Sequence, residues 1–518
     1  MPLQAPPMIA RIFTVGGLTL LSRITGFARD VLLAAILGAG PIADAFFVAL
    51  RLPNHFRAIF AEGAFNSAFV PAYARIRQQE GGTCAGLFAD RVFTLLFAAQ
   101  LMLLALALLF TPALIELLAP GFSSDRLRFA LAVELTRITF PYLLLVSLVT
   151  LYGGILNALS RFAAAAAAPI LLNLSMIMTL ALAAFFPSAG HAAAWGVLLA
   201  GVLEFLLVGG DTLRNGVFPR FRAPKWDEDV KRFFKALAPA TIGSAGLQIA
   251  LFADTIIASF LSAGALSALY YADRLNQLPI GVIGIAIGTV LLPEMASRIA
   301  AGDEAGAKRA QARAIELTLL LALPCLVAFL LLPELIMRAL FMRGAFTAAD
   351  ARAAAQTLAA YALGLLPFVL IRSFTAPFLA RGDTATPVKA SLIAVAVNVI
   401  CKLALMGPLA QVGLALATSI GGWINLALVT WFAARRGHLA FDGGLRASIG
   451  RLLAAGVALA IVLLMAQVGL ARLWPAGDPH GDLPTLALLA AIGAVAYGGA
   501  VVAMFGRNWV AALQRGNS

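Results

Sequence analysis

The amino-acid sequence predicts an all-α protein that crosses a membrane many times. Its 518 residues are 61% hydrophobic and only 12% charged, and the mean hydropathy is +0.93. A soluble domain of average composition carries about 25% charged residues. Apolar runs of about 20 residues recur along the whole chain, which is the length that a helix needs to span a bilayer. A β-barrel is excluded, because barrel strands are short and alternate between apolar and polar residues.

Fourteen stretches are predicted to cross the membrane. The loops after even-numbered spans are basic, whereas the loops after odd-numbered spans are short or nearly neutral. No cationic leader or small-residue cleavage site precedes the first span, so we expect it to be retained. The predicted spans are residues 10–38, 43–74, 88–112, 129–158, 162–186, 191–212, 232–262, 266–297, 308–334, 352–380, 386–408, 411–434, 447–470 and 484–506.

The distribution of basic residues predicts the orientation of the chain. Of the 38 Lys and Arg residues, 24 fall on the side of the N-terminus and the even-numbered loops, and six fall on the other side. By the positive-inside rule, both termini are expected in the cytoplasm. The net charge of +13 follows largely from this topology and gives no support for a nucleic-acid partner. The six residues on the opposite side are Arg126, Arg128, Arg338, Arg343, Arg352 and Arg472.

The two halves of the chain are similar to each other. The segment RDVLLAAILGAGPIADAFFVALRLP, around Asp30, resembles ADTIIASFLSAGALSALYYADRLNQLP, around Asp254. In both segments an Asp is followed by Ala-Gly, a pair of aromatic residues and Arg-Leu. Because six spans are an even number, the repeat predicts two six-helix lobes of the same orientation, related by a pseudo-two-fold axis along the membrane normal. The last two spans lie outside the repeat.

The repeat divides the chain into four parts. These are an N-terminal lobe (1–215), a cytoplasmic linker (216–231), a C-terminal lobe (232–436) and a C-terminal helix pair (437–518). At the linker, apolar residues from Trp226 to Leu237 recur at helical spacing, with Lys231, Arg232 and Lys235 between them. This pattern predicts an amphipathic helix on the membrane surface, with a plain linker as the alternative.

Eight basic residues fall well inside the predicted spans, away from the span ends, and four of them are in the first two spans. A cation at the centre of a membrane helix costs about 2.5–3.5 kcal/mol on insertion scales, so each one is a functional hypothesis. Asp30, Asp44 and Glu62 supply nearby negative charge but are too few to neutralise all the cations. The eight are Arg23, Arg29, Arg51, Arg57, Arg137, Arg274, Arg372 and Lys402.

The cations of the first two spans favour a site for an anionic ligand. Arg23 and Arg29 flank Gly26, which permits a bend, and Arg51 and Arg57 flank Pro53, which disturbs a helix. Arginine forks bind phosphate through two donors, so converging arginines with spare charge predict a phosphate-bearing substrate. The alternative is structural: the arginines pair with nearby acids to hold helices together, or extend to the membrane interface.

An enzyme or an ATP-driven pump finds no support in the sequence. It contains no GxxxxGK[ST] loop for a nucleotide phosphate and no HExxH pair for zinc. Cys84, Cys325 and Cys401 share no CxxC spacing, so neither a disulfide framework nor a metal site is expected. We therefore expect a transporter without a cofactor, driven by an ion gradient, the membrane potential or a substrate gradient.

Several distinctive motifs occur in order along the chain. The first is SRITGFARDVLLAAILGAGPIADAFFVALRLPNHFRAIFAEGAFNSAFVP, from Ser22 to Pro71. It is followed by RITFPY, LNALSRF, YYADRLNQLPIGVIGIAIGTVLLP, GAFTAADA and TPVK. Together these motifs resemble the MurJ (MviN) lipid II flippase family of the MOP exporter superfamily. The resemblance spans the whole chain, including the count of fourteen helices.

The resemblance implies a function in bacterial cell-wall synthesis and cell shape. A member of this family would move lipid II, the undecaprenyl-pyrophosphate disaccharide-pentapeptide, across the bacterial inner membrane from the cytoplasmic to the periplasmic leaflet. The last two helices would form a groove for the lipid tail, among membrane lipids, and cell-wall synthesis proteins would be possible partners. The family's polar cavity residues correspond to Arg23, Arg29, Asp30, Asp44, Asn54, Arg57 and Arg274.

Two positions depart from the family pattern. Some relatives carry Glu where this chain has Gln277, three residues after Arg274. Sodium-coupled members place an acid one turn after the asparagine that corresponds to Asn398, where this chain has Lys402. We therefore expect a remnant of an ion site in which Lys402 pairs with Asp254. The remaining alternatives are an exporter of another lipid-linked oligosaccharide or of a drug or cation, and a structural membrane protein.

Overall fold

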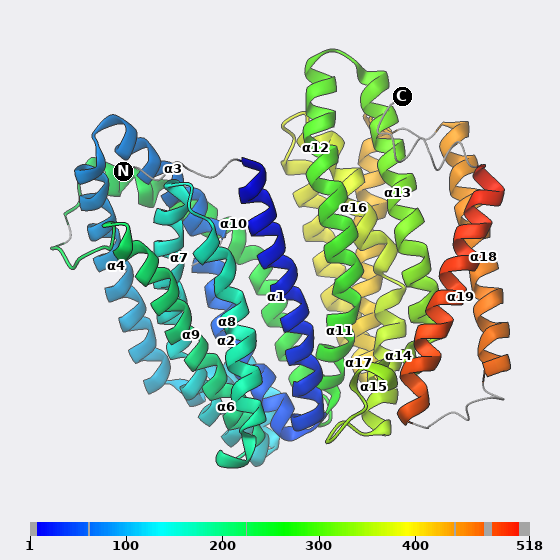
Figure 1. Ribbon diagram of the computed structural model, residues 1–518, viewed down its shortest axis with the longest axis horizontal. Coiled ribbons are helices and arrows are strands. Elements are labelled where there is room, and N and C mark those ends of the chain that lie inside the picture. Colours follow the sequence, from blue (N-terminus) through cyan, green and yellow to red (C-terminus); the bar gives the residue numbers. More distant parts are fainter. Residues whose placement is uncertain (1–7, 61–62, 224, 440–441, 471–478, 507–518) are drawn as a thin grey trace. The chain divides into compact units, whose positions relative to one another are not determined.

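The computed structural model describes residues 8–60, 63–223, 225–439, 442–470 and 479–506 (Figure 1). Within these ranges every regular element is helical, which confirms the predicted all-α class. Among the described residues, ten helices are long and apolar enough to cross a membrane. The chain folds into two compact units: unit 1 comprises residues 1–264 and 343–346, and unit 2 comprises residues 265–342 and 347–518.

The ten apolar helices coincide with predicted spans. The range Ala385–Arg435 alone covers two of them, the eleventh and the twelfth. The first and seventh predicted spans are also helical, and the second is covered by the helices Pro41–Phe60 and Gly63–Gln79, apart from residues 61–62, which lie outside the described residues. These spans are not among the ten. The ten ranges are Gly82–Leu109, Arg126–Ala158, Ala163–Ala181, Ala189–Arg214, Ala265–Ala300, Glu304–Leu331, Ala348–Leu379, Ala385–Arg435, Gly443–Leu470 and Gly481–Phe505.

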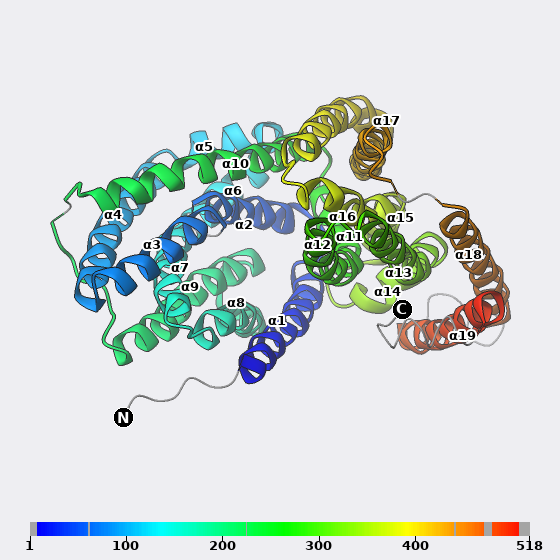
Figure 2. The same ribbon diagram turned by 90° about the horizontal axis from the view of Figure 1, so that it is seen from above.

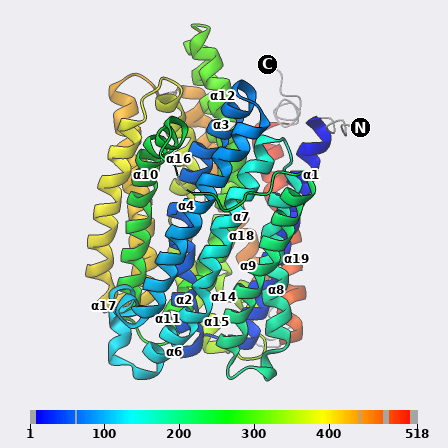
Figure 3. The same ribbon diagram turned by 90° about the vertical axis from the view of Figure 1, so that its left-hand side faces the viewer.

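Unit 1 is a bundle whose long helices run roughly parallel to one another (Figure 3). The main packed pairs are α8 with α9, α1 with α8, α2 with α6, α7 with α9, and α3 with α10. Its elements are α1 (Met8–Leu37), α2 (Pro41–Phe60), α3 (Gly63–Gln79), α4 (Gly82–Leu109), α5 (Thr111–Leu118), η1 (Pro120–Ser124), α6 (Arg126–Thr139), α7 (Pro141–Ala158), α8 (Ala163–Ala181), η2 (Ala183–Phe185), α9 (Ala189–Arg214) and α10 (Glu228–Ser259).

Aromatic side chains fill the part of unit 1 where α3, α4 and α10 meet. Phe69 stacks on Phe65 and Phe88, with ring centroids 5.3 and 5.6 Å apart, and Phe233 of α10 meets all three rings edge-on. Phe69 and Phe233 are almost completely buried. Such offset and edge-on arrangements are the favoured geometries of aromatic pairs. They fix the first part of α10 to unit 1.

The prediction of a membrane-surface helix at the linker is wrong. A single continuous helix, α10, begins at Glu228, and Val230 and Phe233 are buried in the core of unit 1. Ion pairs from Arg75 to Asp229 (2.7 Å) and from Arg91 to Asp227 hold the start of this helix. An amphipathic pattern is the same whether its apolar face meets lipid or protein. Here the apolar face meets α3 and α4.

The boundary between the two contact units differs from the boundary between the sequence repeats, and the difference is the helix α10. The repeat assigns this helix to the C-terminal lobe, yet its contacts are with α2, α3 and other elements of unit 1. The chain passes into unit 2 immediately after Gly264, which has φ of +89°. Glycine adopts this left-handed conformation without the steric cost that other residues incur.

Unit 2 contains the remaining helices. Pro279 is followed by a π-helical turn, so the helix is irregular after this proline. The elements are α11 (Ala265–Pro279), η3 (Ile280–Gly284), α12 (Ile285–Ala300), α13 (Glu304–Leu331), α14 (Pro333–Phe341), α15 (Ala348–Ala362), α16 (Leu365–Leu379), α17 (Ala385–Arg435), α18 (Gly443–Leu470) and α19 (Pro479–Phe505).

Helix α17 is two helices joined at a kink. Ala410, two residues after Pro408, has φ of 47° and ψ of −129°, outside helical geometry. The two ends of α17 meet at Asp383, whose carboxylate accepts from the Thr386 amide (3.0 Å) and hydroxyl (2.7 Å) and pairs with Arg436. These hydrogen bonds and this charge lower the pKa of Asp383 to about 2.

Helices α18 and α19 pack on each other at one side of unit 2 (Figure 2). Nε and Nη2 of Arg338, in α14, donate to the two carboxylate oxygens of Asp482 at 3.0 and 2.8 Å. The Tyr497 hydroxyl donates to the carbonyl oxygen of Leu320 in α13, at 3.0 Å. The pair that the sequence placed outside the repeat is thus attached to the unit through this ion pair of α19 and through the packing of α18 on α13.

Candidate functional site

The cations predicted in the first span have different environments. Arg23 is exposed, whereas Arg29 and Asp30 are only 7% and 4% exposed. Nε and Nη2 of Arg29 donate to Oδ1 of Asp30, at 3.1 and 2.7 Å. Arg29 is therefore ion-paired, as the structural alternative expected for these arginines. Its neighbour along the chain supplies the counter-charge.

Asn173 of α8 completes this cluster, and sequence reasoning missed it. Its Oδ1 accepts from Nη1 of Arg29 (3.0 Å), and its Nδ2 donates to the Ser22 carbonyl (2.9 Å) and to Oγ1 of Thr25 (3.1 Å). Asn173 is 5% exposed. One amide thus orients the guanidinium and holds α1 against α8. The available signal was an amide within an apolar predicted span.

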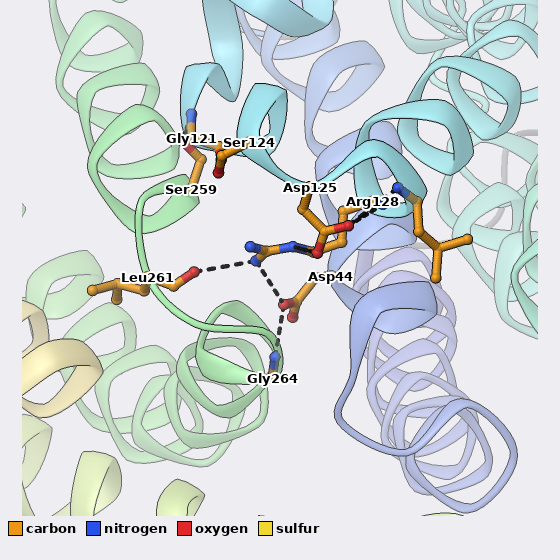
Figure 4. Close-up of polar contacts among 9 residues, drawn as sticks. Asp44, Gly121, Ser124, Asp125, Arg128, Ser259, Leu261 and Gly264 are labelled. Carbon is orange, nitrogen blue, oxygen red and sulfur yellow. Dashed lines mark hydrogen bonds and ion pairs between the residues drawn. The ribbon is translucent and has the colours of Figure 1, made fainter.

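Asp44, at the start of α2, lies at the centre of a second buried network (Figure 4). Its side chain is completely buried, and Oδ2 accepts from the backbone N–H of Gly264 at 2.8 Å. Arg128, just after the start of α6, approaches the same oxygen at 3.8 Å. The Arg128 guanidinium also donates to Asp125 (2.8 Å) and to the carbonyl oxygen of Leu261 (3.1 Å).

This second network attaches the end of α10 to the rest of unit 1. Besides Arg128 and Asp44, the amide of Gly121 donates to Oγ of Ser259 at 3.0 Å. A Cβ at Gly121 would lie 2.3 Å from the Ser259 carbonyl oxygen, so only glycine permits this approach. Sequence reasoning counted Arg128 as a loop charge and assigned it no partner.

The remaining charges of α2 face other helices of unit 1. Nη1 of Arg51 donates to Oγ1 of Thr255 in α10, at 3.3 Å. Asn54 and Arg57 are half-buried. Arg57 interacts electrostatically with Glu204, a buried acid of α9 that also bonds the Tyr142 side chain. Sequence reasoning missed Glu204, although it is the only charged residue in GVLLAGVLEFLLVGG. Glu62 lies outside the described residues.

In unit 2, Arg274 lies in α11 beside Tyr270. Its Nη2 donates to the Tyr270 hydroxyl at 3.1 Å, and its guanidinium is 4.8 Å from the centre of the Tyr270 ring. Gln277, which stands where some relatives have Glu, donates to Asp273 at 2.5 Å. The cation of Arg274 is thus oriented by an aromatic ring one turn earlier.

The residues of the predicted ion-site remnant lie in both units. Asp254 is in α10 of unit 1, and Asn398 and Lys402 are in α17 of unit 2. Lys402 is only 3% exposed, so this cation is inside the protein. The pairing of Lys402 with Asp254 stays a prediction.

A family model described as lipid II flippase MurJ matches residues 33–478. The chain belongs to this family. Proteins named probable lipid II flippase MurJ from Rhizobium tropici and Rhizobium meliloti (strain 1021) are 42% and 43% identical to it, over 88% and 89% of this chain and 86% of each of theirs. MurJ proteins are transporters, and with its apolar helices the chain is a multi-pass protein of the bacterial inner membrane.

Solved structures with the same fold come from this family and from a neighbouring one. A lipid II flippase MurJ in an inward closed conformation has a TM-score of 0.79 at 24% identity, covering 96% of this chain and 99% of that one. An inward-facing multidrug resistance MATE family transporter of the MOP superfamily has a TM-score of 0.64 at 16% identity, covering 82% and 97%. These likenesses show a fold common to MurJ and MATE transporters.

Proposed function

We propose that this protein flips lipid II, the undecaprenyl-pyrophosphate-linked peptidoglycan precursor, from the cytoplasmic to the periplasmic leaflet. The observation that carries the proposal is membership of the MurJ family, whose model matches residues 33–478. The buried Arg29 of α1, held by Asp30 and Asn173, supports it, because a pyrophosphate needs fixed cationic donors in a place that water does not dominate. Lipid II is accordingly the main partner.

The proposed head-group site is formed by Arg23, Arg29, Asp30, Asp44, Asn54, Arg57 and Arg274. Arg23 is exposed, and Arg57 and Arg274 are half-buried. These three side chains would contact the anionic oxygens. Arg29 is oriented by Asp30 and Asn173 and would present a fixed guanidinium. Such preorganisation lowers the entropic cost of binding a flexible head group.

The finer architecture is part of the proposal. Fourteen spans would form two six-helix lobes related by an axis along the membrane normal, with both termini in the cytoplasm. Helices α18 and α19 would form the groove for the polyprenyl tail, and proteins of cell-wall synthesis would act nearby. Transport would follow alternating access, in which the two lobes open the site to one leaflet at a time.

Depletion of the protein in its own bacterium tests the function. A lipid II flippase predicts lysis, with lipid-linked precursor accumulating in the membrane, and rescue by the wild-type gene. Arg57→Ala and Arg274→Ala, produced at wild-type level, should fail to rescue. Arg→Lys at either position should also be impaired, because an ammonium cannot reproduce the guanidinium fork. Full rescue by both Ala variants would reject the proposed site.

The competing function is export of another lipid-linked oligosaccharide or of a drug or cation. Its support is the fold shared with a MATE transporter. In the same depletion experiment, an exporter of drugs predicts sensitivity to toxic compounds and a normal level of lipid-linked precursor. An exporter of another oligosaccharide predicts accumulation of that lipid-linked sugar instead.

Lys402 makes a sodium-coupled mechanism unfavourable, because a buried ammonium occupies the helix face where coupled relatives place an acid. We expect transport without sodium dependence. Lys402→Ala should be damaging alone, and Asp254→Asn should partly rescue it, because the double change removes the orphan charge. Strict sodium dependence of the wild type, or strictly additive defects, would reject the pairing.

A further inference from the structure

A cavity of about 710 Å³ lies in unit 2 between the first turns of α13 and the first turns of α18. A second cavity of about 490 Å³ adjoins it and shares Arg309 and Arg313. Neither cavity includes a residue of the proposed head-group site. The charged residues that line the larger one are Lys308, Arg309, Arg313, Arg451, Glu316 and Asp442.

Three cations of this cavity differ in their pairing from three other loop cations of unit 2. Arg298, Arg381 and Arg436 each pair with a carboxylate: Arg298 with Glu294 at 3.0 Å, Arg381 with Glu304, and Arg436 with Asp383. By contrast, Lys308, Arg309 and Arg451 form no ion pair with any residue that the structure describes.

One of the two acids of the cavity is engaged elsewhere. Asp442 Oδ1 accepts from the backbone N–H of Leu445 at 2.7 Å and so caps the start of α18. Its charge is satisfied in part by the first turn of that helix. Four cations thus face two acids, one of which already serves the backbone. The cavity carries spare positive charge.

The helices that lead away from the cavity are apolar on their exposed faces. On α18, Val457 is 61% exposed and Met465 is 71% exposed, and Leu321 of α13 is 45% exposed. Both helices are among the ten that are apolar enough to cross a membrane. A ligand of the cavity would therefore have acyl or prenyl chains beside α13 and α18 and an anionic group at their first turns.

We propose that this cavity binds the phosphate group of a membrane lipid. The unmatched guanidinium and ammonium groups recognise the phosphate oxygens, and the apolar faces of α13 and α18 accept the chains. Basic-residue counting places this end of both helices on the cytoplasmic side. The phosphate belongs either to an anionic phospholipid or to a polyprenyl carrier. The site does not depend on what the protein transports.

The test measures equilibrium binding of tail-labelled phosphatidylglycerol to the purified full-length protein in neutral detergent micelles. Phosphatidylcholine, whose phosphate is balanced by a choline cation, is the reference lipid. The cavity variant carries Arg309→Gln and Arg451→Gln. The matched control carries Lys389→Gln and Arg446→Gln, which remove the same charge from exposed positions of unit 2 outside the cavity lining.

We expect the wild type to bind phosphatidylglycerol about tenfold or more tightly than phosphatidylcholine. The cavity variant should lose that preference, and the control should keep it. Arg309→Lys should retain most of the binding, because its charge remains. Circular dichroism and the lipid-free Tm should be the same for all variants, since the changed residues are exposed.

The competing ligands distinguish the sources of the phosphate. Displacement by undecaprenyl phosphate at lower concentration than unlabelled phosphatidylglycerol assigns the site to a polyprenyl carrier, and the reverse order assigns it to a phospholipid. Displacement by millimolar glycerol phosphate alone would show a site for soluble anions and overturn the proposal. Equal losses in the cavity variant and the control, or no preference over phosphatidylcholine, would also overturn it.

Discussion

Two buried ionic networks of unit 1 are built in opposite ways. Around Arg29, a cation is held by the next residue of its own helix and by one amide from α8. Around Asp44, an anion is held by a backbone amide after α10 and by Arg128, which joins it to Leu261. The first network orients a charged group and ties two helices. The second joins three distant segments and presents no cation of its own to a ligand.

The difference shows how buried charge is divided between holding a ligand and holding the protein. A guanidinium with a local counter-ion can be oriented without fixing distant parts of the fold. A carboxylate that accepts from the backbone of another segment depends on where that segment lies. Changes at Arg29 should therefore affect the head-group site, and changes at Arg128 should affect the attachment of α10.

The largest effect is expected for Arg29→Ala. It removes the cation that holds the buried Asp30 carboxylate, and breaking such a pair costs about 3–5 kcal/mol. Thermal unfolding of the purified protein measures this loss. Adding Asp30→Asn should recover part of the stability and none of the rescue in depleted cells, because the guanidinium is still missing. Recovery of rescue by the double variant would show that Arg29 is purely structural.

Arg128→Gln tests the second network. It should lower the free energy of unfolding by about 2 kcal/mol, because the buried Asp44 and the Leu261 carbonyl both lose a donor. Hydrogen exchange should accelerate at the backbone amides of residues 259–264, including Gly264. The matched control is Arg126→Gln, two residues earlier, exposed and outside the network. Exchange that accelerates equally in both variants would contradict a specific attachment of α10.

A smaller loss in the free energy of unfolding, about 1–2 kcal/mol, is expected for Asn173→Ala. This change leaves Arg29 paired with Asp30 but removes its second partner. The decisive measurement is substrate handling and not stability. Rescue of depleted cells should fall more than it does for Ser175→Ala, a buried polar residue of α8 that bonds only its own helix. Equal rescue by the two variants would remove Asn173 from the positioning role.

The smallest effect is the pH dependence at Asp383, outside both networks. Because its pKa is lowered from 3.8 to about 2 in the folded protein, its hydrogen bonds stabilise the fold above about pH 4. That contribution is lost as the pH falls from about 4 to about 2. The pKa values of Asp125 and Asp303 are also lowered, so they contribute in the same direction.

Asp383→Asn isolates the contribution of that one carboxylate. The Tm of the wild type should fall more steeply than that of the variant between pH 4 and pH 2, and the two curves should run parallel above pH 5. Asp442→Asn, also at the start of a helix, is the comparison variant. Identical slopes in wild type and Asp383→Asn would show that Asp383 is not held in its ionised form.

The sequence predicted the class of fold and part of the site, for identifiable reasons. Long apolar runs and adjacent charges such as Arg29 and Asp30 are local patterns, visible within a short stretch of the sequence. Asn173 and Arg128 become informative only when distant segments are in contact, and no local spacing indicates that contact. The amphipathic stretch before Leu237 was misread because helical periodicity does not specify what covers the apolar face.

Helices α13 and α18 each have 28 residues, so each is about 42 Å long at about 1.5 Å per residue. The hydrocarbon layer of a bilayer is only about 30 Å thick. The surplus of about two turns per helix matches the stretch that carries Lys308, Arg309 and Arg451. If the surplus lies at this end, as the proposed lipid site requires, these cations would lie at the depth of the lipid head groups, and bilayer thickness would set how far they reach into water. A membrane thicker by a few ångströms would then bring them closer to the ester layer.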